Sequence, residues 1–178
     1  LNEFLTSLLE TGKSLDTTRL YTAAFDLVYY EPKTRHFEMH DDFTDKLDVV
    51  AVNKYMGWYH PWPVDPSEAV WDVCPDKPLI ISEFGGEALY GQSGDEDVTS
   101  SWSEEYQAKI IGNTMDFVLK SERCTGTALW LFANANTYFD AIHVMTRPRG
   151  FNNKGLLSEY RAPKLAWHLV SQIMKQKA

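Results

Sequence analysis

The sequence predicts an α/β fold organised around a parallel β-sheet. Four short segments of four to six apolar or small residues have the length of buried strands. Segments with helical spacing alternate with them, and each predicted strand leads into a polar loop. Because two parallel strands need a crossover connection, usually a helix, this alternation is typical of a parallel sheet.

The composition fits a packed domain and excludes several partner classes. Of the 178 residues, 44% are hydrophobic, which is enough for a core. The formal net charge of −8 argues against a nucleic-acid or membrane partner, because phosphate binding needs clustered positive charge. No apolar run reaches the roughly 20 residues of a membrane span. Cys74 and Cys124 lack metal-ligand spacing, so we expect two free thiols and no metal site.

The first predicted element is an amphipathic helix that ends near Gly12. Apolar residues recur along it at helical spacing: Leu1, Phe4, Leu5, Leu8 and Leu9. No N-cap residue precedes this stripe, so we expect the natural protein to continue upstream. A first strand follows at Arg19–Phe25, and the polar segment Glu31–His40, which contains a proline, is predicted to be a loop.

Two strands are predicted in the middle of the chain. A short helix at Asp42–Leu47 precedes the second strand, Val49–Asn53. Helix start signals then predict a brief helix at Ser67–Cys74. The third strand, Leu79–Glu83, has a proline before it and two glycines just after it, which bound it sharply.

The last part of the sequence alternates a loop, a helix, a strand and a helix. The polar segment Gly85–Ser101 has the length of an active-site loop rather than of a simple connector. The longest helix is predicted over Ser103–Leu119 and the fourth strand over Thr127–Phe132. After a long polar loop, Pro163 begins a final helix with apolar residues at helical spacing.

Glu83 is the strongest candidate for a catalytic residue. A carboxylate at the end of a buried strand must be hydrogen-bonded, paired or used for chemistry. In a parallel α/β sheet, and above all in a β/α barrel, the carboxyl ends of the strands form the ligand-binding face. A structural ion pair is the alternative role for Glu83.

Four strand–helix units make about half of an eight-fold β/α barrel, which usually has about 250 residues. Half a barrel would expose two sheet edges and its inner face. We therefore expect residues 1–178 to be the C-terminal half of such a barrel, about its strands 5 to 8, within a larger multidomain protein. The aromatic share of 13% agrees with a sugar site, since aromatic faces stack on sugar rings, but aromatic residues also fill cores.

Four segments, in this order, resemble the C-terminal half of the barrel in glycoside hydrolase family 2. They are Val52–Tyr59, Ile81–Gly85, Leu129–Phe132 and Asn152–Gly155. The family contains β-glucuronidases, β-galactosidases and β-mannosidases, and the likeness is greatest to its β-glucuronidase-type members. The resemblance spans nearly the whole chain.

The resemblance implies roles for seven residues. Glu83 corresponds to the catalytic nucleophile at the end of the seventh strand. Asn53, Tyr55 and Tyr59 correspond to residues that line the sugar pocket, although both tyrosines would also suit ordinary aromatic packing. A second group corresponds to the pocket floor and to the contacts with a glucuronate carboxylate: Trp130, and then Asn152 and Lys154.

The implied reaction is hydrolysis of terminal β-linked sugars by a retaining, exo-acting β-glycosidase that uses double displacement. Such enzymes need two carboxyl groups about 5–5.5 Å apart. The family's general acid/base is a glutamate upstream of Leu1, and no residue of this sequence corresponds to it. A non-catalytic carbohydrate-binding fragment is therefore one alternative. A β-galactosidase of the same family is another, because the Asn-x-Lys-Gly element also occurs in some galactosidase-like relatives.

The resemblance also implies partners. We expect a carbohydrate substrate, no cofactor, and contacts with the N-terminal remainder of the barrel and with β-sandwich domains of the same protein. A homo-oligomer is left open, and the sequence does not indicate a compartment.

Several charged residues have alternative roles. Lys154 is either a charge for a substrate carboxylate or a solvated loop lysine. Arg147 and Arg149 either share its role or offset the acidity of the chain. Glu87 could be a second carboxylate of the site, but we expect it to lie on the surface of its loop. Asp140 is a candidate for the pocket. Three histidines lack the spacing of metal ligands and are predicted to be structural or exposed: His40, His143 and His168.

Overall fold

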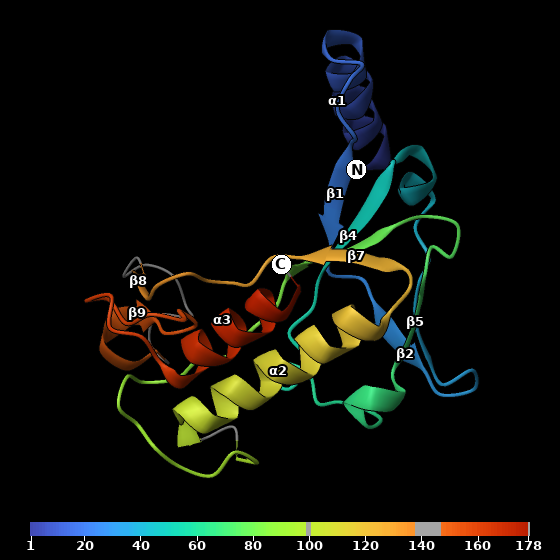
Figure 1. Ribbon diagram of the computed structural model, residues 1–178. Coiled ribbons are helices and arrows are strands. Elements are labelled where there is room, and N and C mark those ends of the chain that lie inside the picture. The colour runs from blue at the N-terminus through green and yellow to red at the C-terminus, as the bar shows by residue number, and fades with distance from the viewer. Residues whose placement is uncertain (99–100, 138–146, 178) are drawn as a thin grey trace.

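The computed structural model describes residues 1–98, 101–137 and 147–177 (Figure 1). Its centre is a four-stranded parallel sheet with the strand order β1–β4–β6–β7. These strands are β1 at Thr22–Phe25, β4 at Val49–Asn53, β6 at Leu79–Glu83 and β7 at Cys124–Thr127. The parallel sheet predicted from the sequence is confirmed.

The strands β4 and β6 form the middle of the sheet. All of Val49–Val52 is buried, as expected for a strand that is covered on both sides. Val52 pairs with Ile81, and after a shift of register Asn53 pairs with Glu83. Asn53 and Glu83 therefore lie side by side at the carboxyl ends of adjacent strands, the edge at which parallel sheets bind ligands.

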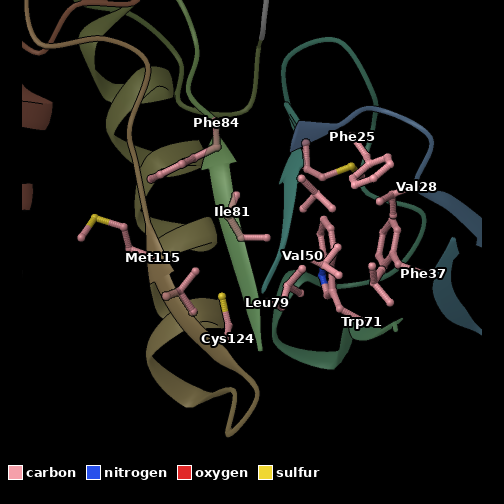
Figure 2. Close-up of a cluster of buried hydrophobic side chains, with 14 of the residues drawn as sticks. Phe25, Val28, Phe37, Val50, Trp71, Leu79, Ile81, Phe84, Met115 and Cys124 are labelled. Atoms are coloured by element: carbon pink, nitrogen blue, oxygen red, sulfur yellow. The ribbon is translucent and has the colours of Figure 1, made fainter. Parts of the chain in front are cut away.

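Two helices pack side by side next to the sheet, α2 at Glu104–Lys120 and α3 at Leu165–Lys177 (Figure 1). Both were predicted, with bounds that differ by one or two residues. Ser103 caps α2, because its side chain accepts a hydrogen bond of 3.1 Å from the N–H of Tyr106. The apolar face of α2 joins the core that contains β6, and Met115 and Ile81 belong to the same cluster of buried side chains (Figure 2).

A small second sheet completes the core. It contains β2 at Tyr29–Glu31, β3 at His36–Met39 and β5 at Val70–Val73. The rings of Phe37 and Trp71, on β3 and β5, stack with centroids 4.7 Å apart (Figure 2).

Two sequence predictions are wrong in this second sheet. Glu31–His40 is not a loop, because it forms most of the β2–β3 hairpin, in which the buried Phe37 and Met39 alternate with more exposed neighbours. Ser67–Cys74 is not a helix, since only a turn of 3₁₀ helix at Pro66–Glu68 precedes β5. Buried and exposed residues alternate over Val70–Val73 in the structure, but the sequence Val-Trp-Asp-Val does not alternate between polar and apolar side chains, so it gave no strand signal.

The first helix, α1 at Asn2–Leu15, stands away from the sheet (Figure 1). Leu5 and Leu9 pack against the core, whereas Leu1, Phe4 and Leu8 of the same stripe are 91%, 64% and 54% exposed. The helix continues past Gly12, where it was predicted to end. The predicted short helix before β4 is a 3₁₀ helix at Asp42–Lys46.

The fourth strand is shorter and earlier than predicted. β7 ends at Thr127, and the segment up to Phe132 is irregular, although the N–H of Ala128 still bonds to the carbonyl of Ile81 at 2.9 Å. Short strands β8 at Ala135–Asn136 and β9 at Phe151–Asn152 then pair antiparallel beyond the end of the sheet. Within the described part of the chain, no helix has the length and apolar character of a membrane span.

Candidate active site at the carboxyl ends of β4 and β6

Glu83 ends β6, and its side chain is partly buried. The hydroxyl of Tyr55 donates a hydrogen bond of 2.6 Å to Oε2 of Glu83. Burial raises the pKa of Tyr55 well above its ordinary range, and the hydrogen bond to Glu83 adds to this effect. Tyr55 therefore stays a proton donor at neutral pH.

Hydrogen bonds of Asn53 and Lys54 connect the end of β4 to β6. The side-chain oxygen of Asn53 accepts a hydrogen bond of 2.7 Å from the hydroxyl of Ser82. The backbone N–H of Lys54 donates to the carbonyl of Glu83 at 2.9 Å. These two bonds keep the side chains at this edge in fixed relative positions.

The turn after β4 carries two tyrosines of the site. The N–H groups of Tyr59 and His60 bond to the carbonyl of Tyr55 at 3.0 and 3.3 Å, which closes the turn. The rings of Tyr55 and Tyr59 meet edge to face with centroids 5.2 Å apart. Gly57 has a φ of +83°, and a Cβ at this position would lie 2.5 Å from Ile110, so the turn requires a glycine.

Lys154 reaches the same turn from a distant loop. Its side chain is only 2% exposed, so a solvated loop lysine is excluded. The ammonium donates a hydrogen bond of 2.7 Å to the hydroxyl of Tyr59 and lies 4.7 Å from the centroid of its ring. Tyr55 and Tyr59 thus connect Glu83 with Lys154, 71 residues apart in the sequence.

Asn152 and Trp130 lie next to these residues in the chain fold. The side-chain oxygen of Asn152 accepts a hydrogen bond of 3.2 Å from the backbone N–H of Lys154. Trp130 is 44% exposed, and its backbone N–H donates a hydrogen bond of 3.0 Å to the carbonyl of Phe84. Gly85 has a φ of +143°, and a Cβ there would lie 2.6 Å from the carbonyl oxygen of Trp130. A glycine is therefore needed for the backbones to approach so closely.

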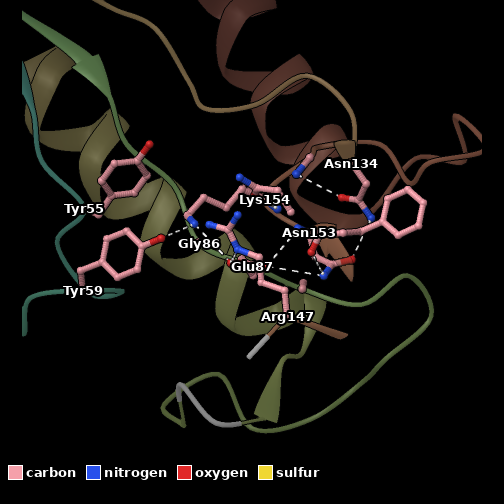
Figure 3. A network of polar contacts seen from close by, with 12 residues as sticks. Tyr55, Tyr59, Gly86, Glu87, Asn134, Arg147, Asn153 and Lys154 are labelled. Carbon is pink, nitrogen blue, oxygen red and sulfur yellow. Dashed lines mark hydrogen bonds and ion pairs between the residues drawn. The ribbon is translucent and has the colours of Figure 1, made fainter. Parts of the chain in front are cut away.

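Glu87 is a member of this site that the sequence analysis placed on the surface, and that prediction is wrong. Its side chain is 3% exposed (Figure 3). Oε1 of Glu87 lies 3.3 Å from the ammonium of Lys154 and 3.2 Å from Nε of Arg147. Oε2 accepts a hydrogen bond of 2.9 Å from the backbone N–H of Asn153. The two cations, which are distant in sequence but adjacent in space, compensate the charge of this buried carboxylate.

A second buried lysine, Lys164, lies behind the loop that carries Lys154. It is fully buried, and its ammonium donates to the carbonyls of Ala88 and Asn153, each at 2.7 Å, and to the side-chain oxygen of Asn134 at 3.0 Å. Burial lowers the pKa of Lys164 to about 8. The sequence next to Lys164 did not indicate that this lysine is buried, because its three acceptors lie 11, 30 and 76 residues away.

The remaining candidates are separated from the site or lie outside the described residues. Arg149 pairs with Glu159 at 2.9 Å and not with the carboxylate of Glu87. Asp140 and His143 lie outside the described residues. Within the described ranges, no group of three His, Cys, Asp or Glu side chains is arranged to hold a metal ion.

The arrangement places a carboxylate next to a pair of largely buried cations. Glu83 is a carboxylate at the ligand-binding edge of the sheet, held by Tyr55. On the other side of the tyrosine pair, Lys154 and Arg147 carry two positive charges against the single negative charge of Glu87. A ligand with a carboxylate would balance the remaining positive charge.

Comparison with known proteins identifies the chain's relatives. The family model described as glycosyl hydrolases family 2, TIM barrel domain, matches residues 2–177. The β-glucuronidase of Rattus norvegicus is 30% identical over 179 aligned residues, which cover 93% of this chain and 26% of that protein. The β-glucuronidase of Streptococcus agalactiae is 28% identical, with 92% of this chain and 26% of that protein covered.

Solved structures give the same picture. A crystal structure of a family 2 β-galacturonidase from Eisenbergiella tayi, bound to galacturonate, superposes with a TM-score of 0.78 at 30% identity. It covers 98% of this chain, which in turn covers 30% of that protein. The β-D-glucuronidase of Dictyoglomus thermophilum has a TM-score of 0.75 at 24% identity, with 98% and 29% covered, and supports the fold. The chain therefore spans between a quarter and a third of the length of these relatives.

Proposed function

This chain belongs to glycoside hydrolase family 2, and we propose that it is the nucleophile-bearing half of the barrel in a retaining, exo-acting β-glycosidase that hydrolyses β-linked uronides. β-Glucuronides are the preferred substrates in this proposal. The observation that carries it is the tyrosine pair that joins a carboxylate, Glu83, to a buried cation, Lys154. The nucleophile and the residue that recognises the charge of the sugar would then lie within one small site.

Glu83 is the proposed nucleophile. In its ionised form it attacks the anomeric carbon of the terminal sugar, and the bond to the leaving oxygen breaks as a glycosyl ester forms on Glu83. Water then attacks the anomeric carbon and gives its proton to the acid/base residue, which releases the sugar with its original β configuration and returns Glu83 to a carboxylate. The hydrogen bond from Tyr55 keeps the carboxylate oriented during attack.

The proton for the leaving oxygen must come from a second carboxyl group about 5–5.5 Å from the first. We propose that this acid/base residue belongs to the N-terminal half of the barrel, outside residues 1–178. The relatives are three to four times as long as this chain, which agrees with such a remainder. Further partners in this proposal are β-sandwich domains of the same protein, while the oligomeric state stays open.

Lys154 is the proposed recognition residue for the sugar's carboxylate. It is a buried cation close to the tyrosines, and Asn152 accepts from its backbone. The names of the relatives agree with an anionic sugar, since they are β-glucuronidases and a β-galacturonidase. Three further residues are proposed to line the sugar pocket: Asn53, Tyr59 and the partly exposed Trp130.

Two other functions remain alternatives. A β-galactosidase of the same family would use Glu83 in the same way but would not need the cation at Lys154. A non-catalytic carbohydrate-binding protein would keep the aromatic pocket without a second carboxyl group. Neither alternative requires a buried, charged lysine at the site, and we therefore favour the uronide hypothesis.

The proposal is tested with the complete protein and three p-nitrophenyl substrates: the β-glucuronide, the β-galacturonide and the β-galactoside. We expect turnover of a uronide, and we expect kcat to fall by roughly a thousand-fold or more in the Glu83→Gln variant. Preference for the galactoside would favour the first alternative. Binding of the sugars without turnover of any substrate would favour the second.

A further inference from the structure

The buried carboxylate of Glu87 has no role in the chemistry proposed above, yet it occupies the centre of the polar network. It lies four residues after Glu83, beyond the two glycines, and is 3% exposed. Figure 3 shows it between the loop of Lys154 and the side chain of Arg147. A buried carboxylate is costly unless charges or hydrogen bonds compensate it.

Both carboxylate oxygens of Glu87 accept hydrogen bonds, and their partners differ. Oε1 lies between two cations, at 3.3 Å from Nζ of Lys154 and 3.2 Å from Nε of Arg147. Oε2 accepts from the backbone N–H of Asn153 at 2.9 Å and from the side-chain amide of the same residue at 3.5 Å. Glu87 therefore fixes both the charged end of Lys154 and the backbone just before it.

The directions of the Lys154 donors make this arrangement specific. An ammonium has three N–H donors. Two have partners among the described residues, the hydroxyl of Tyr59 at 2.7 Å and Glu87 at 3.3 Å. With these two directions fixed, the direction of the third donor is also fixed, because the three are arranged tetrahedrally.

We infer that Glu87 is a positioning residue for uronide specificity, which aims the third donor of Lys154 at the carboxylate of the sugar and keeps Arg147 beside it. This inference rests on the proposed function. On the Glu87 side of the tyrosine pair, one anion between two cations leaves a single positive charge, which one sugar carboxylate neutralises. The charge of Glu83 lies on the other side of this pair and faces the anomeric carbon. A neutral sugar leaves that charge uncompensated in a buried site, so Glu87 and its two cations discriminate between the two substrates.

The test compares three variants of the complete protein on p-nitrophenyl β-glucuronide and on the matched neutral β-glucoside. Glu87→Gln removes the charge and keeps the shape, and Glu87→Asp keeps the charge but withdraws it by one methylene. Glu38→Gln is the matched control, because it removes a partly buried carboxylate on β3 whose partners are Thr34 and His40.

We expect Glu87→Gln to lower kcat/KM for the glucuronide by about 10- to 100-fold, mainly through KM, since a hydrogen bond to a charged group is lost. The loss on the glucoside should be at least about 10-fold smaller. Glu87→Asp should show a smaller loss with the same selectivity, and Glu38→Gln should leave the ratio of the two substrates unchanged. If Glu87→Gln does not fold, the Glu87→Asp ratio decides.

Three results would overturn the inference. Equal losses on both substrates would indicate a structural role, and no loss on either substrate would remove Glu87 from recognition. A lower KM for the glucuronide would mean that Glu87 competes with the substrate for Lys154. Each of these results presupposes that the unmodified protein hydrolyses the glucuronide. Lack of uronide turnover by the unmodified protein would instead contradict the proposed function itself.

Discussion

The hydroxyl of Tyr55 donates a 2.6 Å hydrogen bond to Oε2 of Glu83, and this bond joins the end of β6 to the turn that follows β4. The same turn carries Tyr59, which accepts a hydrogen bond from Lys154. One short turn therefore sets the positions of both the proposed nucleophile and the proposed recognition cation. Four predictions follow from these contacts and from the residues that support them.

Removal of the Tyr55 hydroxyl should impair the nucleophile without unfolding the protein. In Tyr55→Phe the ring stays, but Glu83 loses its 2.6 Å donor. A hydrogen bond to a charged group contributes about 1.5–3 kcal/mol, so we expect kcat/KM to fall by roughly 10- to 150-fold. Tyr160→Phe, which changes an 84% exposed tyrosine, is the control and should have no effect on kcat/KM. An unchanged kcat/KM in Tyr55→Phe would contradict the proposed role.

Lys154 should matter for uronides and little for neutral sugars. Lys154→Ala removes the buried ammonium that lies between Tyr59 and Glu87. The ratio of kcat/KM for the β-glucuronide to that for the β-galactoside should fall by about 100-fold, because a charged contact is lost only with the anionic substrate. Lys120→Ala, at an exposed ion pair with Asp116, is the control. Equal losses on both substrates would remove Lys154 from carboxylate recognition.

Gly85 should be intolerant of a side chain. In Gly85→Ala the new Cβ would lie 2.6 Å from the carbonyl oxygen of Trp130, so one of the two backbones must move. Gly91 also has a positive φ, of +77°, but no atom lies within 4 Å of its Cβ position. Gly91→Ala should therefore cost only about 1–2 kcal/mol of backbone strain, and Gly85→Ala should cost more and should also lower kcat. Thermal unfolding and steady-state kinetics of the two variants measure this difference. Equal effects would mean that the contact with Trp130 does not constrain the site.

Lys164 should give the protein a specific dependence of stability on pH. Burial lowers the pKa of Lys164 to about 8 in the folded state, below its ordinary value of 10.5. Between these pH values the unfolded chain holds more protons than the folded chain, so the contribution of Lys164 to stability rises with pH. It is unfavourable below pH 8, and the cost disappears as the pH passes 10.5.

The comparison of the unmodified protein with Lys164→Met isolates this effect. The free energy of unfolding of the unmodified protein, minus that of the variant, should increase by up to about 3 kcal/mol between pH 8 and 10.5. Other titrating groups cancel in this difference. A difference that falls or stays flat with rising pH would contradict a lowered pKa for Lys164.

The parallel sheet and the position of Glu83 could be predicted because their signals are local. The strand of Glu83 is a run of apolar residues bounded by proline and glycine, and the family resemblance agrees with it. The β2–β3 hairpin was missed because its strands are short and half polar. Its burial depends on Trp71, which lies on β5, a strand that was itself predicted to be helical.

The support of the site could not be predicted, because it depends on contacts between distant segments. Glu87 was predicted to be exposed, since no feature of its own loop compensates its charge. Its partners, Arg147 and Lys154, lie 60 and 67 residues away. The burial of Lys164 likewise depends on acceptors as far away as Ala88, 76 residues distant. Charges in such positions are determined by the tertiary fold and not by sequence pattern.

Covalent trapping would show whether Glu83 is the nucleophile of a uronide-specific site. The complete protein is incubated with an activated 2-deoxy-2-fluoro β-glucuronide or with the matched galactoside, and its intact mass and peptide map are measured. Such reagents form the glycosyl ester but lose it slowly, and they depend little on the acid/base residue because their leaving group departs readily. We predict one adduct, from the glucuronide, on Glu83. An adduct on another residue, or no adduct on folded protein, would contradict it.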